Sequence, residues 1–278
     1  PDVVLFDRYV TEEQFGWRVS ENCPNAIRII DTEDLHFLRT ARQIAFKENR
    51  ELEYSDFINT VFKRELASIL RCDLSLIISQ YEYRLLIETF HIAPHNLLYI
   101  PFLNREVIPS LIGFNERKNF VSIGNFLHEP NWQTVLKLKA LWKSIRMQLS
   151  DAEMHIYGAY ASEKVFQLHN DKEGFLIKGR AENVTDVFNS ARVLLAPIPF
   201  GAGLKGKLWE SMLYGLPNVT TEVGAEGMQW NGLWNGYIAN SDEGFIEKAV
   251  QLYTSESDWN QAQENGYEIA KNQFDWET

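Results

Sequence analysis

One stretch decides how the second half of the chain folds: residues 191–210 read ARVLLAPIPFGAGLKGKLWE. The apolar run that ends at Ala196 is typical of a buried β-strand. Two prolines and two glycines, Gly201 and Gly203, then predict a turn, and a helix is expected over residues 205–214. A strand, a tight loop and a helix in this order are the repeating unit of parallel α/β sheets.

The loop in this stretch suits an anionic ligand. Backbone N–H groups at a helix start lack intrahelical partners and lie at the positive end of the helix dipole. Two lysines in the same turn add cations suited to a diphosphate, and the carboxylate of Glu210 can accept hydrogen bonds from a ribose diol. The stretch therefore predicts a nucleotide site formed by Gly201, Gly203, Leu204, Lys205, Lys207 and Glu210.

The same glycines permit other interpretations. Gly201, Gly203 and Gly206 fit the dinucleotide pattern G-x-G-x-x-G, which alone is a weak signal. In dehydrogenases this pattern follows the first strand of its domain, whereas here it follows the fourth. A third interpretation is a helix start whose lysines lie in water and bind no ligand.

Short apolar runs alternate with helical segments along the whole chain, which predicts an α/β fold with parallel sheets. In the first half, strands are expected at residues 3–6, 26–30, 74–79 and 97–100, and helices at 12–20, 35–48, 55–70 and 81–90. In the second half, strands are expected at 120–123, 154–157, 175–177, 193–196, 218–221 and 237–239, and helices at 131–149, 162–168, 184–191, 205–214, 243–253 and 258–273.

The segment 101–118 contains two prolines and a glycine and is expected to be a linker. It divides the chain into two Rossmann-like domains that face each other across a cleft, at residues 1–110 and 111–278. The last helix is expected to cross back to the first domain. In open α/β sheets ligands bind at the carboxyl ends of the strands, so the loops after the strands are where a site is sought.

Composition excludes several classes of protein. Lysine and arginine number 27 against 38 acidic residues, a net charge of −11, which argues against non-specific nucleic-acid binding. No apolar run approaches the roughly 18–20 residues of a membrane-spanning helix, and no signal peptide is evident. With only two cysteines and no zinc-type cluster, a cytoplasmic location is expected. No Asp-x-Asp pair supports a divalent metal site.

Several motifs of the second half occur together and in register with the expected strands. They are the loop at Gly124-Asn125 with Glu129-Pro-Asn-Trp132, the strand and turn Met154-His-Ile-Tyr-Gly158, the loop Lys178-Gly-Arg180, the segment Gly201 to Met212, and Gly215-Leu-Pro217. This combination resembles the retaining glycosyltransferases of the two-domain GT-B fold, specifically the large family 4 group.

The resemblance implies transfer of a sugar from a nucleotide diphosphate sugar to an acceptor hydroxyl, with retention, without a metal ion and without a cofactor. Lys205 and Lys207 are expected to act in catalysis, and Gly124 and Arg180 to join the donor site. The acceptor, whether glycan, lipid, small molecule or protein, stays open. The resemblance also implies that the first domain is incomplete as given, because a strand and a glycine-rich acceptor loop would precede Pro1.

One position departs from the family pattern. Many members carry two glutamates eight positions apart; Glu210 fills the second position, and Ala202 stands at the first, where the donor sugar would be contacted. This leaves open a degenerate module that binds a nucleotide sugar without turnover. Two other GT-B chemistries, a sugar-nucleotide epimerase and a phosphorylase, are further alternatives, although nothing indicates the lysine-held cofactor of the latter.

Acidic residues and a histidine follow the second expected strand. Asp34 and His36 are candidates for the acceptor side, where a carboxylate or an imidazole can orient or deprotonate a hydroxyl group. The alternative is that the acids of this segment only cap the next helix and complement its dipole.

Overall fold

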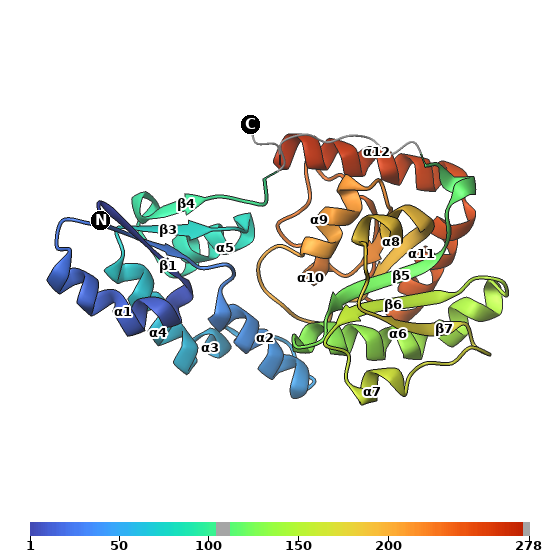
Figure 1. The fold of residues 1–278 in the computed structure, drawn as a ribbon, viewed down its shortest axis with the longest axis horizontal. Helices are drawn as coiled ribbons and strands as arrows, with labels where there is room; N and C mark the ends of the chain where they lie inside the picture. Colours follow the sequence, from blue (N-terminus) through green and yellow to red (C-terminus); the bar gives the residue numbers. More distant parts are fainter. Residues whose placement is uncertain (104–111, 275–278) are drawn as a thin grey trace. The chain divides into compact units, whose positions relative to one another are not determined.

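The computed structural model describes residues 1–103 and 112–274 (Figure 1). Contacts divide the chain into two compact units: Pro1–Leu103 with Phe200–Leu204, and Asn104–Pro199 with Lys205–Thr278. Residues 104–111 of the linker expected at 101–118 lie outside the described residues, and the last part of the predicted linker contains η3 (Phe114–Glu116) and the first residue of β5, Lys118. No helix of the described part is long and apolar enough to cross a membrane.

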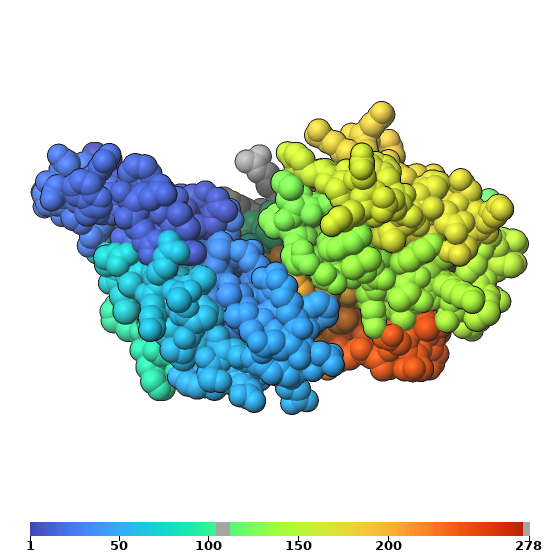
Figure 2. Space-filling view, turned by 90° about the horizontal axis from the view of Figure 1, so that it is seen from below, coloured from blue at the N-terminus to red at the C-terminus, as the bar shows by residue number. Residues whose placement is uncertain are grey.

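The first unit is built on a parallel four-stranded sheet of order β1-β2-β3-β4. Its side chains Phe6, Ile30, Ile77 and Leu97 are buried on one face. Helices cover this face, and in Figure 2 they form the blue to cyan surface turned toward the viewer. The elements are β1 (Val3–Asp7), α1 (Arg8–Asn22), β2 (Ile27–Asp31), α2 (His36–Lys47), α3 (Tyr54–Phe57), α4 (Thr60–Arg71), β3 (Leu74–Ile77), α5 (Gln80–Arg84), η1 (Leu85–Thr89), η2 (Pro94–Asn96) and β4 (Leu97–Tyr99).

Two helix predictions in this unit were wrong in detail. The helix expected at 55–70 is two helices, because the chain leaves the helix at Ile58 and the side chain of Asn59 accepts a hydrogen bond from Phe62 N–H as the N-cap of α4. The helix expected at 81–90 begins as α5 and continues as a π-helical turn, η1. The strands are those expected.

The second unit contains a parallel six-stranded sheet of order β10-β9-β8-β5-β6-β7. Counted from its own first strand, this is the 3-2-1-4-5-6 order of the doubly wound Rossmann sheet. The strands are β5 (Lys118–Asn125), β6 (Met154–Ala159), β7 (Phe175–Gly179), β8 (Ala191–Ala196), β9 (Asn218–Thr220) and β10 (Gly236–Ile238). The strand order reverses between β5 and β8, which are hydrogen-bonded neighbours.

Helices line both faces of this sheet, as a parallel sheet requires. They are η3 (Phe114–Glu116), α6 (Glu129–Gln148), α7 (Glu163–Phe166), α8 (Val184–Ser190), α9 (Gly206–Leu213), α10 (Glu222–Ala225), α11 (Asp242–Thr254) and α12 (Glu256–Gln273). Phe120, Trp142, Phe175 and Trp259 belong to the main core. Helix α12 packs on α9 and β10 of its own unit, and the short α10 was not expected.

Candidate functional site

The carboxyl edge of the second sheet brings together residues that are far apart in the sequence. Strand β5 ends at Gly124 and Asn125, and its neighbour β8 ends at Ala196, ahead of the loop that leads to α9. The crevice where the strand order reverses is the usual ligand site of a doubly wound sheet. The loops after β5 and β8 therefore lie where a nucleotide is expected to bind.

Lys207 extends from the first turn of α9 toward the loop after β5. Its Nζ lies 2.6 Å from Oδ1 of Asn131. Burial of the amine, with the nearby charge of Lys205, lowers the pKa of Lys207 to about 8. Gly124, Asn131 and Lys207 line the same small pocket, together with Tyr157. A partly buried cation at the switch point of the sheet is suited to an anionic ligand.

Two further predicted residues lie on the same helix. Lys205 is the N-cap residue of α9, so its side chain leaves the chain at the positive end of the helix dipole. Glu210, one turn on, is partly buried, and burial raises the pKa of its carboxyl. Within the part of the chain that the structure describes, this carboxylate has no hydrogen-bond or ion-pair partner, so it can accept hydrogen bonds from a ligand.

Arg180 follows β7 at the same edge of the sheet and is exposed.

Gly206 tests the dinucleotide interpretation, because the third glycine of that pattern is needed for close packing of helix on strand. A Cβ built on Gly206 would meet nothing within 4 Å. The glycine therefore has no packing role of that kind, and this observation disfavours a dinucleotide site.

The loop Phe200–Leu204 packs with the first unit. The carbonyl oxygen of Gly201 accepts a hydrogen bond from Arg42 at 2.8 Å, and the N–H of Gly203 donates to Oε1 of Glu82 at 2.7 Å. Gly203 has φ +62°, and a Cβ there would lie 2.8 Å from Cβ of Asp34. The backbone conformation and the close packing at position 203 both explain why a glycine stands there. The donor-binding role expected for Gly201, Gly203 and Leu204 stays a prediction.

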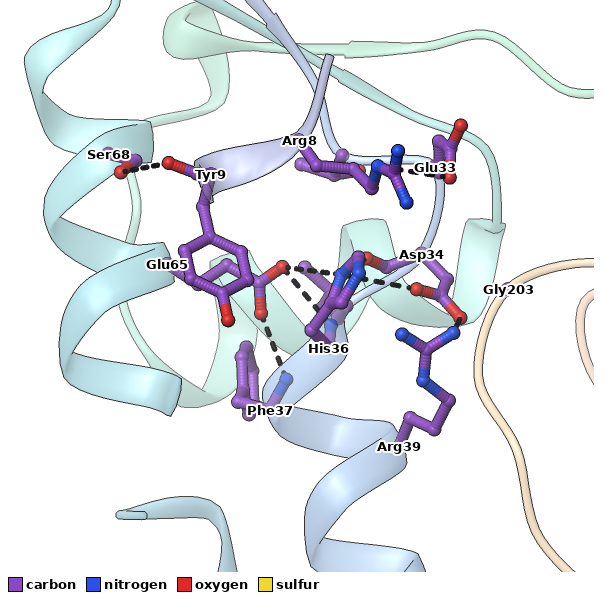
Figure 3. Close-up of polar contacts among 12 residues, drawn as sticks. Arg8, Tyr9, Glu33, Asp34, His36, Phe37, Arg39, Glu65, Ser68 and Gly203 are labelled. Carbon is purple, nitrogen blue, oxygen red and sulfur yellow. Dashed lines mark hydrogen bonds and ion pairs between the residues drawn. The ribbon is translucent and has the colours of Figure 1, made fainter. Parts of the chain in front are cut away.

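Asp34 and His36 lie in one polar cluster of the first unit (Figure 3). Nδ1 of His36 lies 3.3 Å from Oδ1 of Asp34 and 3.3 Å from Oε1 of Glu65, and the Tyr9 ring meets the imidazole edge-on at 5.4 Å. Arg39 donates to the other oxygen of Asp34 at 2.8 Å. His36 is therefore held through Nδ1, and Nε2 has no hydrogen-bond partner within residues 1–103 and 112–274.

Two residues beside this cluster have strained backbones. Arg8 and Glu33 have φ values of +63° and +56°, and their side chains form an ion pair at 3.5 Å. They follow the carboxyl ends of the neighbouring strands β1 and β2. Left-handed conformations of non-glycine residues concentrate at functional sites, so these turns support a site at this edge of the first sheet.

The charge state of His36 makes stability depend on pH. Burial lowers its pKa, but the hydrogen bond to Glu65 and the charges of Asp34 and Glu65 outweigh burial and the repulsion from Arg39, so the net pKa is raised. A histidine whose folded pKa exceeds the unfolded value of about 6.5 stabilises the fold fully below that value. This contribution is lost as the pH rises through the folded pKa.

We therefore expect the titration of His36 to make the free energy of unfolding fall as the pH rises above about 6.5, whereas deprotonation of Lys207 above about pH 8 acts in the opposite direction. The fall should be smaller in His36→Gln, whose side chain does not titrate. Urea unfolding of both proteins at pH 6, 7, 8 and 9 measures the difference. Equal pH dependence of the two proteins would contradict the assignment.

Two residues of these sites were missed from the sequence, Asn131 and Glu65. Asn131 stands in the Glu-Pro-Asn start of α6, a motif that contributes to the family resemblance but does not by itself indicate a role for the asparagine. Glu65, 1% exposed, lies on the apolar side of α4, where an acidic residue is unusual and was the available signal. Among the described residues, no group of three or more His, Cys, Asp or Glu side chains could hold a metal ion.

Residues 117–255, half of the chain, match the family model described as Glycosyl transferases group 1. This segment contains Gly124, Asn131, Arg180, Lys205, Lys207 and Glu210. No curated protein sequence matches the chain.

Many solved structures share the fold. S. aureus TarM, in a complex that includes UDP, aligns with a TM-score of 0.74 at 13% identity over 98% of this chain and 52% of TarM. The pneumococcal O-GlcNAc transferase GtfA, with UDP and GlcNAc, has a TM-score of 0.70 at 19% identity, over 98% of this chain and 54% of GtfA. Sucrose-phosphate synthase from Thermosynechococcus elongatus has a TM-score of 0.71 at 14% identity, over 99% of this chain and 70% of the synthase. This chain spans about half the length of the first two, and at these identities the likeness shows the fold alone.

Proposed function

This chain belongs to the glycosyl transferases group 1 family, and we propose that it transfers a sugar from a nucleotide diphosphate sugar to an acceptor hydroxyl group. We place it with the family 4 enzymes, which retain the configuration at the anomeric carbon, and propose that it needs no metal ion. The observation that carries the proposal is the partly buried Lys207 amine, which extends from the start of α9 toward the switch point of the sheet.

In the proposed reaction, negative charge develops on the leaving diphosphate, beside the cations of Lys205 and Lys207. The bond between the anomeric carbon and the diphosphate oxygen breaks, the acceptor oxygen bonds to that carbon, and the proton of the acceptor hydroxyl group passes to the leaving diphosphate. Preorganised groups that stabilise the charge developing on the leaving diphosphate usually make the largest catalytic contribution. Lys207, Lys205 and the N-terminus of α9 supply this stabilisation, and Glu210 accepts hydrogen bonds from the ribose.

We propose that Asp34 and His36 serve the acceptor side. Nδ1 of the imidazole lies 3.0 Å from the backbone carbonyl oxygen of Asp34 and 3.3 Å from the carboxylate of Glu65, which leaves Nε2 to contact a hydroxyl group. The acceptor class, whether glycan, lipid, small molecule or protein, is to be identified by an assay of sugar transfer to acceptors of each kind.

Binding of the donor should raise thermal stability. A ligand at 100 times its Kd stabilises the folded state by about 2.7 kcal/mol, which corresponds to a rise in Tm of roughly 5 °C for a protein of this size. We expect one of UDP-, GDP-, ADP- or dTDP-sugars to produce this rise, and excess EDTA not to remove it. The control is Lys207→Met, in which the rise should shrink. No shift with any of the four donors would overturn the proposal.

One observation favours a second function, a module that binds the nucleotide sugar without turnover. Ala202, which replaces the sugar-contacting glutamate of many relatives, is 7% exposed and belongs to a hydrophobic cluster of the first unit. Donor binding without transfer to any acceptor and without donor hydrolysis would establish that function. Conversion of the donor sugar with no acceptor present would indicate an epimerase instead.

A further inference from the structure

The side chain of Asn131 connects the loop after β5 to α9. Its Oδ1 accepts a hydrogen bond from Nζ of Lys207 at 2.6 Å, and its Nδ2 donates to the backbone carbonyl of Asn125 at 2.8 Å. The ammonium group can only donate and the carbonyl can only accept, so both partners fix the same orientation of the amide. Asn131 therefore offers one oxygen, at one position, to the lysine.

The lack of a side chain at Gly124 leaves space for the amide group of Asn131. A Cβ on Gly124 would lie 2.7 Å from Cγ, 2.8 Å from Oδ1 and 3.0 Å from Nδ2 of Asn131. These three nearest atoms are the amide group itself, so any residue other than glycine displaces the group that holds Lys207. The backbone of Gly124 does not need a left-handed conformation, since its φ is not positive. Space for Asn131 accounts for the glycine.

Lys207 needs such a partner. A lysine side chain has four rotatable bonds and loses about 2 kcal/mol of rotamer entropy when it is fixed in one conformation. Burial and the charge of Lys205 both disfavour its protonated form. A neutral acceptor at 2.6 Å fixes the amine and favours its charged form without neutralising it, which a carboxylate at the same position would do.

From this geometry we infer that Asn131 is the positioning residue of Lys207, and that Gly124 is required because it accommodates Asn131. Only the expected effect of these residues on turnover rests on the proposed function. The contact among the three residues involves only side chains and backbone of the protein itself.

Chemical labelling tests the contact directly. Acetic anhydride modifies the neutral amine, and mass spectrometry of the folded protein at pH 7 gives the labelling of Lys207 relative to the exposed Lys143. Asn131→Leu keeps the volume and removes the acceptor. Loss of one hydrogen bond to a charged group corresponds to about one pKa unit, so at pH 7 the neutral fraction of Lys207, and with it the labelling ratio, should rise about fivefold. Gln148→Leu, at an exposed position of the same helix, should leave it unchanged.

A double-mutant cycle tests the role of Gly124. Gly124→Ala alone should raise the labelling ratio and lower turnover about tenfold, and Asn131→Ala alone should do the same. In the Asn131→Ala background the same change should have no further effect, because the atoms it would strike are gone. An equal effect of Gly124→Ala in both backgrounds would overturn the inference, since the glycine would then serve the ligand directly. Circular dichroism confirms that each variant is folded.

The two proposals fail separately. Unchanged labelling of Lys207 in Asn131→Leu overturns the positioning role, whatever happens to turnover. Increased labelling with wild-type donor binding and turnover supports the positioning role and overturns the part of Lys207 in the proposed reaction.

Discussion

Replacement of Lys207 by methionine is expected to lower the rate of sugar transfer about 100-fold. Removal of a single preorganised donor to a developing oxyanion has an effect of this size. Lys205 and the N-terminus of α9 remain in the variant, so transfer should not be abolished. Initial rates of product formation, measured by mass spectrometry with the donor found in the stability screen, give the comparison.

The Tm of Lys207→Met should rise or stay unchanged, although its transfer rate falls. Burial lowers the pKa of Lys207 to about 8, so the fold bears a cost for keeping this amine charged. Methionine has nearly the same length and no charge to bury. A residue whose loss lowers activity while Tm is kept or raised is held for function and not for folding.

Lys143→Met is the matched control, because Lys143 is exposed on α6. Its transfer rate and Tm should equal those of the unchanged protein. Equal transfer rates in Lys207→Met and the control would exclude Lys207 from the reaction, and a large fall in Tm of Lys207→Met would make its role structural.

The strands were predictable because their signal is local. Each one is a short apolar run bounded by glycine, proline or acidic residues, and a strand buried in a parallel sheet needs no partner to be recognised. The split of the helix expected at 55–70 was not predicted, although Asn59 is a good N-cap residue. The π-helical turn η1 was not predicted either, since an apolar pattern does not distinguish it from an α-helix.

The site was predictable only where the motif is contiguous. Lys205, Lys207 and Glu210 lie on one helix start, so their spacing alone places them together. The hydrogen bond between Asn131 and Lys207 joins residues 76 positions apart, and its existence depends on β5 and β8 being neighbours in the sheet. Glu65 reaches the start of α2 across 28 positions. Such contacts follow from strand order and helix packing, which no local pattern specifies.

The second large effect is expected on the free energy of unfolding, when Glu65 is replaced. It is buried on α4, and its two carboxylate oxygens accept hydrogen bonds from the N–H groups of His36 at 3.1 Å and Phe37 at 2.9 Å. These N–H groups open α2, whose N-cap residue is Leu35, a side chain that cannot accept a hydrogen bond. A carboxylate from another helix therefore serves as the cap and complements the helix dipole.

Glu65→Ala is expected to destabilise the first unit by about 2–6 kcal/mol, because it leaves one partly buried and one buried N–H group without an acceptor at about 1–3 kcal/mol each. Urea unfolding measures the loss, and faster hydrogen exchange at the amides of His36 and Phe37 locates it. Glu65→Gln keeps one carbonyl acceptor and should lose less. Glu21→Ala, at an exposed position of α1, should change stability by no more than about 0.5 kcal/mol. If Glu65→Ala unfolded at the same urea concentration as Glu21→Ala, the carboxylate would not be the cap of α2, and the fixed orientation of His36 would need another cause.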